Sequence, residues 1–232
     1  MIAQTSRESA EPSRDCPFCP RLAAFREEWR AREPSWFNAP VPTWLPPEGE
    51  DGVRLLVVGM APGLRGANRT GRPFTGDYAG NLLFDTMFRF GFARGRYEAR
   101  PDDGLQLVGA AITNAARCVP PENKPTGAEV ATCRQFLAPT LRRFPHLKAV
   151  LTLGVIAHQS AVRALGLRVA ALPFKHGLAQ NAGGIAVVSS YHCSRYNTST
   201  GVLTSEMFQE VFSRLRAIVG GAEPVAAISP AP

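Results

Sequence analysis

A long loop rich in glycine, arginine and hydroxyl groups, residues 59–80, carries the strongest chemical signal in this 232-residue sequence. Asp77 is the only carboxylate of the loop, and its arginines are Arg65, Arg69 and Arg72. Glycine has no side chain to keep a ligand away, so it lets backbone amides approach closely. The loop therefore suits an anionic partner together with one acid–base group. Its glycine spacing matches neither G-x-G-x-x-G nor G-x-x-x-x-G-K-[ST], the common phosphate-binding patterns.

The chain around this loop alternates short apolar runs with helical patterns. The apolar runs predict strands at 53–58, 105–113, 149–153 and 185–189. The helical patterns predict helices at about 21–32, 79–90, 126–144, 155–165 and 204–219. Such alternation predicts the α/β class, here a three-layer α/β/α sandwich with a central, mainly parallel four-stranded sheet.

Polar loops follow three of the predicted strands, at 59–80, 114–126 and 190–200. Loops at the carboxyl ends of parallel strands meet at one edge of the sheet, so these three are expected to build one site. Residues 15–219 are expected to form a single domain, preceded by a disordered N-terminus (1–14) and followed by a flexible tail (220–232).

Composition and charge describe a basic globular protein. Hydrophobic residues make up 45% of the chain, and the net charge is +7. A basic surface attracts nucleic acid, acidic membranes or anionic substrates, although an arginine-rich chain can also reflect the base composition of its gene. The polar start is no secretory signal and no apolar run is long enough to span a bilayer. An intracellular, cytoplasmic protein is expected, in which cysteines rarely form structural disulfides.

Four cysteines have the spacing of a metal site. Cys16 and Cys19 form a C-x-x-C knuckle, and Cys118 and Cys133 follow in a proline-rich segment and a predicted helix. Four thiolates are a complete ligand set for zinc or for a [4Fe–4S] cluster, and spacing alone does not separate the two. The alternative is four unrelated buried thiols, since free cysteine is often a small core residue.

A fifth cysteine, Cys193, is adjacent to His192. A Cys–His nucleophilic pair is conceivable, but neighbours in sequence rarely present both side chains to the same atom, and no third orienting residue is evident. The role of Cys193 stays open.

Three motifs in this order resemble the uracil-DNA glycosylase superfamily. They are Gly59–Gly80, which contains Gly-Met-Ala-Pro-Gly and Gly-Arg-Pro-Phe, then Asn114–Pro125, and then His192–Thr198. The resemblance spans nearly the whole chain from Cys16 onward, and its nearest group is family 5, the UDGb type with an iron–sulfur cluster. It implies a structural [4Fe–4S] cluster with four ligands, Cys16, Cys19, Cys118 and Cys133.

Met60 departs from many members of that superfamily, which carry Asp, Asn or Glu after this glycine to position the attacking water. The UDGb type is similar to this chain in having an apolar residue there. The resemblance then implies that Asp77 supplies the catalytic carboxylate, which stabilises the sugar's positive charge and orients water. The alternative is that Asp77 only caps the helix that follows it.

The resemblance also implies roles for three side chains that would contact the base. His192 would donate to the leaving base, Asn114 would pair with a base edge, and Phe74 would stack on the flipped base. Their alternatives are a structural histidine, an Asx turn and a core aromatic residue. The remaining expected substrate contacts are Gly59, Met60, Ala61 and Gly63.

The third motif and the first loop supply the expected DNA contacts. Arg195 and Tyr196 are candidates for entering the minor groove, as this loop does in the relatives. The other expected contacts are Arg69, Arg72, Ser194 and Asn197.

Together these features predict a monofunctional DNA glycosylase that flips a nucleotide and hydrolyses the N-glycosidic bond of uracil. The resemblance adds hypoxanthine or xanthine as further bases. A lyase step through a Schiff base is not favoured, because Lys124 is the only lysine in the loops of the expected site. The expected partner of the monomer is double-stranded DNA with deaminated bases; single-stranded DNA stays open, and no membrane is expected. Two alternatives remain: a non-catalytic iron–sulfur protein of this fold that binds nucleic acid, and a zinc-stabilised nucleotide hydrolase.

Overall fold

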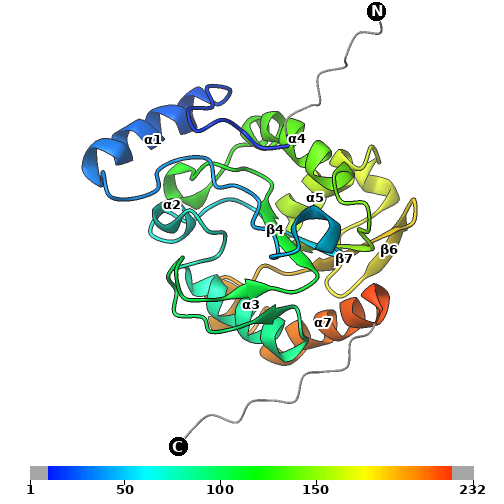
Figure 1. The fold of residues 1–232 in the computed structure, drawn as a ribbon. Coiled ribbons are helices and arrows are strands. Elements are labelled where there is room, and N and C mark those ends of the chain that lie inside the picture. The colour runs from blue at the N-terminus through cyan, green and yellow to red at the C-terminus, as the bar shows by residue number, and fades with distance from the viewer. Residues whose placement is uncertain (1–9, 221–232) are drawn as a thin grey trace, which may run out of the picture.

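The computed structural model describes residues 10–220, and a five-stranded sheet forms its centre (Figure 1). The order of the strands across the sheet is β4-β1-β5-β7-β6. The strands are β1 (Leu55–Gly59), β4 (Ala110–Asn114), β5 (Ala149–Leu153), β6 (Ala179–Ala182) and β7 (Ile185–Ser190). The first four strands in this order are parallel, and β6 pairs antiparallel with β7. This confirms the predicted α/β class and adds one antiparallel edge strand to the four expected.

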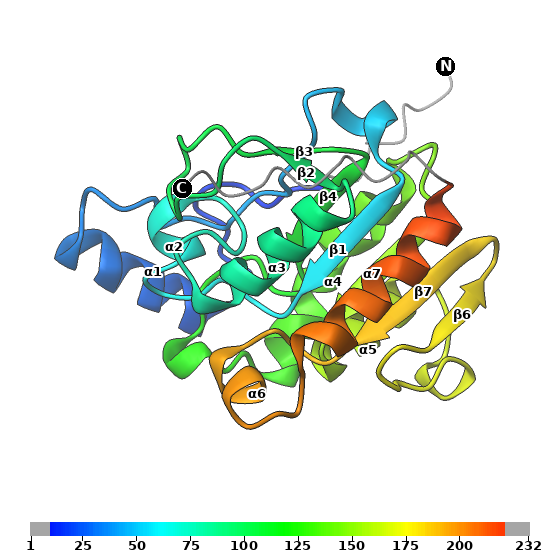
Figure 2. The same ribbon diagram turned by 90° about the horizontal axis from the view of Figure 1, so that it is seen from below.

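Helices cover both faces of the sheet, as Figure 2 shows. They are α3 (Tyr78–Arg89) and α7 (Ser205–Val219) on one face, and α4 (Gly127–Arg142) and α5 (Val155–Ala164) on the other. Because strand side chains alternate between faces, Leu55 and Val57 pack with α3 and α7, whereas Leu56 and Val58 pack with α4 and α5. All four side chains are fully buried, as expected for a central strand of a parallel sheet.

Smaller elements surround these three layers. They are α1 (Pro20–Arg32), α2 (Ala67–Thr70), α6 (Arg195–Ser199), the 3₁₀ turns η1 (Gly49–Gly52), η2 (Pro121–Asn123) and η3 (Val169–Ala171), and the two-stranded ribbon of β2 (Ala93–Arg94) and β3 (Gln106–Leu107). Within residues 10–220, no helix is long and apolar enough to cross a membrane.

The strand expected at 105–113 is divided in the structure. Its first part is β3 of the ribbon, and its second part is β4 of the central sheet. Gly109 lies between them with a φ of 62°, a left-handed conformation that glycine adopts without strain. Apolar periodicity did not reveal this break, because both parts of the strand are apolar.

The start of α4 is confirmed as a capping box. The Glu129 amide donates to the Thr126 hydroxyl at 3.2 Å, and the Thr126 amide donates to the Glu129 carboxylate at 2.8 Å. Arg21 of α1 forms a bidentate pair with the same carboxylate, at 2.7 and 2.8 Å, and donates to the Lys124 carbonyl at 3.0 Å. The capping box therefore also attaches α1 to the segment that precedes α4.

The expectation of disorder at 1–14 and of a mobile tail after residue 220 falls mostly outside the described residues. Within the described part, the Glu11 carboxylate accepts hydrogen bonds from Arg117 and Arg143, each at 2.9 Å. Arg117 is 1% exposed, so this carboxylate supplies a counter-charge to a buried guanidinium.

A buried ion pair joins the glycine-rich loop to the segment before β3. The Arg72 guanidinium donates to both carboxylate oxygens of Asp103, at 2.8 Å each, and lies over the Trp44 ring. Burial alone would raise the pKa of Asp103, but hydrogen bonds from Arg72 and from the amides of Glu98 and Leu105 outweigh it and lower the pKa to about 2.

Replacing Asp103 with asparagine would keep the side-chain shape and leave a buried guanidinium without its counter-charge. We expect the free energy of unfolding at pH 7, measured by urea denaturation, to fall by about 3 kcal/mol or more. Glu28→Gln, which removes a surface pair with Arg32, is the matched control and should change it by less than about 1 kcal/mol.

The same pair gives a pH signature. A carboxyl with a lowered pKa stabilises the fold above its unfolded pKa, so this stabilisation should disappear as the pH falls from about 4 to about 2. Asp103→Asn should lack this part of the acid dependence, and equal acid sensitivity of the two proteins would contradict it.

Candidate active site

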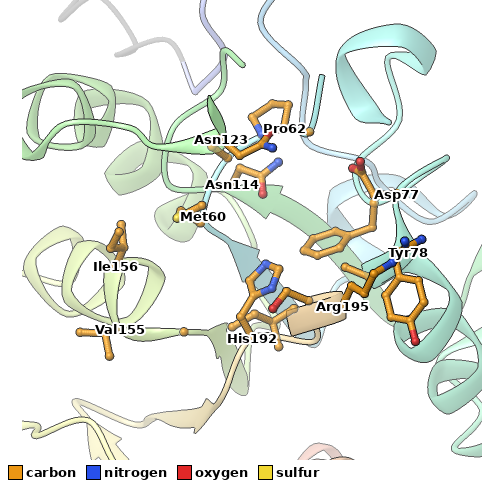
Figure 3. A pocket seen from close by; sticks show the side chains of 17 residues that line it. Met60, Pro62, Asp77, Tyr78, Asn114, Asn123, Val155, Ile156, His192 and Arg195 are labelled. Carbon is orange, nitrogen blue, oxygen red and sulfur yellow. The ribbon is translucent and has the colours of Figure 1, made fainter. Parts of the chain in front are cut away.

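A cavity of about 580 Å³ opens at the carboxyl ends of the parallel strands (Figure 3). Its lining comes from all three loops that were expected to meet there, together with the start of α5. The predicted site residues that line it are Met60, Ala61, Gly63, Phe74, Asp77, Asn114, His192, Ser194 and Arg195. The structure therefore brings together the proposed carboxylate, the imidazole and the amide from three separate segments.

The position of Asp77 depends on two glycines of the loop. A Cβ atom at Gly63 or Gly66 would collide with the Asp77 carboxylate. The absence of those side chains lets the carboxylate reach the backbone amides of Gly63 and Ala67, the latter at 3.4 Å. The first loop is therefore shaped around this carboxylate.

The helix-cap alternative for Asp77 does not describe its side chain. Asp77 occupies the N-cap position of α3, but its side chain makes no capping hydrogen bond to that helix. The carboxylate turns back toward α2 and faces the cavity. Burial raises the pKa of Asp77, whereas the amides of Ala67 and Gly63 and the charge of Arg69 favour the ionised form.

His192 and Phe74 bring two rings to the same cavity. The ring centroids are 6.2 Å apart with an angle of 28° between the planes. Burial lowers the pKa of His192 to about 4, so its imidazole is neutral at pH 7. A neutral imidazole has one nitrogen that donates a hydrogen bond and one that accepts.

Asn114 ends β4 and is only 3% exposed. Its side-chain amide has no hydrogen-bond partner among residues 10–220, although it lines the cavity. The amide atoms face the cavity and are not enclosed by the protein, so they can pair with a ligand that offers both a donor and an acceptor.

Met60 and Ala61 line the cavity, whereas Gly59, the last residue of β1, was expected to contact the substrate but is not part of the lining. A Cβ at Gly59 would overlap the Asn114 amide and the Phe74 ring, so glycine is required for both to approach. The Met60 side chain faces the cavity and contributes an apolar surface (Figure 3).

The mouth of the cavity carries the third motif. Ser194 caps α6 by accepting a hydrogen bond from the Asn197 amide, and the Asn197 side chain donates to the His192 carbonyl at 2.8 Å. Arg195 lies over the Tyr78 ring, 4.8 Å from its centroid, and the Tyr196 side chain on α6 is 73% exposed. Asn197 therefore supports the histidine, while Arg195 and Tyr196 are open to an approaching partner.

The two arginines of the first loop lie in different surroundings. Arg69 is exposed, and its charge acts on Asp77. Arg72 is only 7% exposed and bound to Asp103, which argues against the DNA contact expected of it. Its role is to hold the loop.

Sequence reasoning missed one wall of the cavity. Gly154, Val155 and Ile156, at the junction of β5 and α5, line it, and the side chains of Val155 and Ile156 are 47% and 38% exposed. Tyr78 and Asn123 also line it. The apolar pair at the start of a helix was a signal, but only the central position of β5 in the sheet shows that it faces the site.

The four candidate metal ligands meet at a second place in the structure, outside the lining of the large cavity. They line one small cavity between the N-terminal arm and α4, and all four are free thiols: Cys16, Cys19, Cys118 and Cys133. Burial raises the pKa of Cys118 to about 12, and the three neighbouring thiols add to the shift. Within residues 10–220, no three Cys, His, Asp or Glu side chains stand close enough together to hold a single metal ion.

Comparisons with known proteins agree with this geometry. A family model described as the uracil DNA glycosylase superfamily matches residues 46–216. The chain is 42% identical to the type-5 uracil-DNA glycosylase of Thermus thermophilus, over 88% of this chain and 94% of that protein. It is 40% identical to a type-5 uracil-DNA glycosylase of Pyrobaculum aerophilum, over 89% and 90%.

A type-4 uracil-DNA glycosylase of Pyrobaculum aerophilum is more distant, at 29% identity over 76% of this chain and 82% of that protein. The family match covers most of the chain, including every segment that lines the cavity from Met60 to Arg195. The protein belongs to the uracil DNA glycosylase superfamily.

Proposed function

We propose that this protein is a DNA glycosylase that removes uracil from DNA by hydrolysing the N-glycosidic bond. Its relatives are named uracil-DNA glycosylases, which are hydrolases that act on N-glycosyl bonds. The observation that carries the proposal is the single cavity that joins Asp77, His192 and Asn114. The cavity can hold a base that has been rotated out of the double helix, as enzymes acting on bases require.

Asp77 acts on the sugar side of the bond. Cleavage builds positive, oxocarbenium-like charge on the sugar, and a nearby carboxylate stabilises it and orients the attacking water. Two backbone amides, from Gly63 and Ala67, hold the carboxylate at a fixed position and favour its ionised form. Met60 has no group that activates water, which leaves this task to Asp77.

His192 and Asn114 act on the base side. Negative charge develops on the leaving base, and the neutral His192 ring donates a hydrogen bond to it, as a donor of an oxyanion hole does. Asn114 pairs with the base edge through its free amide, and Phe74 stacks on the base. As the N-glycosidic bond breaks, Asp77 stabilises the positive charge on the sugar, and His192 and Asn114 stabilise the negative charge on the base.

The breadth of the cavity supports further substrates. A volume of about 580 Å³ with an apolar wall at Met60, Val155 and Ile156 suits a two-ring base as well as uracil. We therefore include hypoxanthine and xanthine among the bases removed.

DNA would approach the mouth of the cavity. Arg195, Tyr196 and Arg69 are exposed around it, and the net charge of +7 favours a polyanion. Phosphate contacts offset the cost of unstacking the nucleotide, so DNA binding should weaken steeply with salt. We propose that the protein acts as a monomer inside the cell on double-stranded DNA.

We further propose that Cys16, Cys19, Cys118 and Cys133 hold a [4Fe–4S] cluster. The support is that all four line one cavity and that none is oxidised to a disulfide. Iron and sulfide occupy the centre of such a cluster, so the thiolates around it stand farther apart than around a single ion. When bound, the cluster would hold α1 and the segment after β4 together.

Asp77→Asn is the direct test of the mechanism. We expect single-turnover excision from duplexes containing uracil or hypoxanthine to slow by about 10²- to 10⁴-fold, because the carboxylate's charge is lost. Asp85→Asn on α3 is the matched control, since Asp85 is a carboxylate outside the cavity lining. Full activity of Asp77→Asn would remove Asp77 from the mechanism, and a wild-type protein that releases no base would refute the proposed function.

The pH profile tests the protonation states. Asp77 must be ionised and its pKa is raised, so the excision rate should fall on the acid side as Asp77 is protonated. His192 has a pKa of about 4 and therefore stays neutral between pH 7 and pH 5, so protonation of its ring should not raise the excision rate in this interval. An increase in this interval would show that the charged imidazole is the active form.

Metal analysis tests the cluster. The protein purified without oxygen should absorb visible light as iron–sulfur proteins do and contain about four iron and four sulfide per chain. Cys118→Ala should lose both, while Cys193→Ala should keep them, because Cys193 is buried elsewhere, beside the β-sheet core. Stoichiometric zinc in place of iron would overturn this assignment.

A further inference from the structure

Segment 91–104, which contains β2, contacts the glycine-rich loop through two side chains. One is Arg72, which forms the buried pair with Asp103 and donates to the Pro101 carbonyl at 3.3 Å. The other is Tyr97, whose hydroxyl accepts a hydrogen bond from the Gly76 amide at 3.4 Å and donates to the Phe74 carbonyl at 3.3 Å. Tyr97 does not itself line the cavity.

The two backbone groups that Tyr97 joins belong to the turn that presents the reacting residues. The carbonyl belongs to Phe74, whose ring lines the cavity. The amide belongs to Gly76, the residue before Asp77, whose carboxylate lines the same cavity. A shift of this turn would therefore move the ring and the carboxylate together.

The turn needs external support. Phe74 has a φ of 58° and Gly76 a φ of 85°, both left-handed. Glycine adopts this conformation freely, but a bulky side chain does so only where its surroundings enforce it. The hydroxyl of Tyr97 bridges these two residues.

Tyr97 is well fixed for this task. Its ring packs on Phe84 of α3, with centroids 4.6 Å apart. Gly80 makes room for this hydrogen bond, because a Cβ at residue 80 would collide with the Phe74 carbonyl and the Tyr97 hydroxyl. Burial raises the pKa of Tyr97, although the Gly76 amide opposes it, so the hydroxyl keeps its proton and can donate at neutral pH.

We propose that Tyr97 is a positioning residue of the glycosylase reaction, whose hydroxyl holds the 74–76 turn so that Phe74 and Asp77 face one cavity. The expected effect on excision rests on the proposed function. The brace itself is a property of the fold and has its own readout, the exchange of the Gly76 amide proton.

Tyr97→Phe removes only the hydroxyl and keeps the ring on Phe84. We expect single-turnover excision of uracil to slow by about tenfold to a hundredfold, because misplacing a reacting group by about 1 Å can cost about a hundredfold in rate. Affinity for the uracil-containing duplex should stay within about twofold, because Tyr97 does not reach the cavity. Hydrogen exchange of the Gly76 amide should become faster.

Two further variants complete the experiment. Thr86→Val is the control: it removes another buried hydroxyl from the same side of the fold, one that donates to the Leu82 carbonyl at 2.7 Å, and should leave excision and Gly76 exchange unchanged. Gly80→Ala places a Cβ against both the Phe74 carbonyl and the Tyr97 hydroxyl, so it must displace the turn, the hydroxyl or both, and should reproduce the loss of excision. It keeps the test available if Tyr97→Phe does not fold.

The outcomes separate this inference from the proposed function. A wild-type excision rate in Tyr97→Phe, or unchanged Gly76 exchange in that variant, would overturn the positioning role while the function stands. If Tyr97→Phe does not fold, a wild-type excision rate in Gly80→Ala would overturn it. A loss of excision that equals the loss in Thr86→Val would also overturn it, since the effect would then be general destabilisation. A wild-type protein without any excision would refute the function, and Gly76 exchange would still decide whether Tyr97 braces the turn.

Discussion

The structure of the site depends on the close approach of one carboxylate to a backbone without side chains. Asp77 fits only because Gly63 and Gly66 have no Cβ atoms, and it turns away from the helix it begins toward the amides of Gly63 and Ala67. Two further features support this arrangement: the pair of Arg72 with Asp103 anchors the loop to the segment before β3, and the left-handed turn at Phe74 brings that ring to the cavity. A carboxylate held by fixed dipoles needs little reorganisation when charge develops beside it.

Much of this could be predicted from the sequence because the fold class follows from local pattern. Apolar runs identified the parallel strands, and a polar loop after three of the four indicated a shared edge. His192 and Asn114 were predicted through motifs, and both line the cavity. The glycines also suggested a close approach, but the sequence did not show that the group approaching them is the loop's own Asp77 and not only a ligand's phosphate.

What could not be predicted depends on strand order and on burial. Arg72 carries the same charge as Arg69, yet one is enclosed with Asp103 and the other is exposed, and no local pattern separates them. The β5–α5 wall with Val155 and Ile156 was missed because the order β4-β1-β5-β7-β6 is a property of long-range pairing. The role of Tyr97 likewise has no local signal in the sequence, since its hydroxyl bonds only to backbone groups that are distant in sequence.

The course of the chain after β4 has a consequence for the cell. From Asn114 in the cavity it passes Cys118 among the clustered thiols and comes back to the cavity at Asn123, while Arg21 holds the carbonyl of the next residue, Lys124. One short stretch thus belongs to both sites. If those thiols bind iron and sulfur as proposed, the shape of the base pocket is tied to a prosthetic group that oxidants destroy, and the capacity to clear damaged bases would follow iron supply and oxidative stress as well as the amount of enzyme.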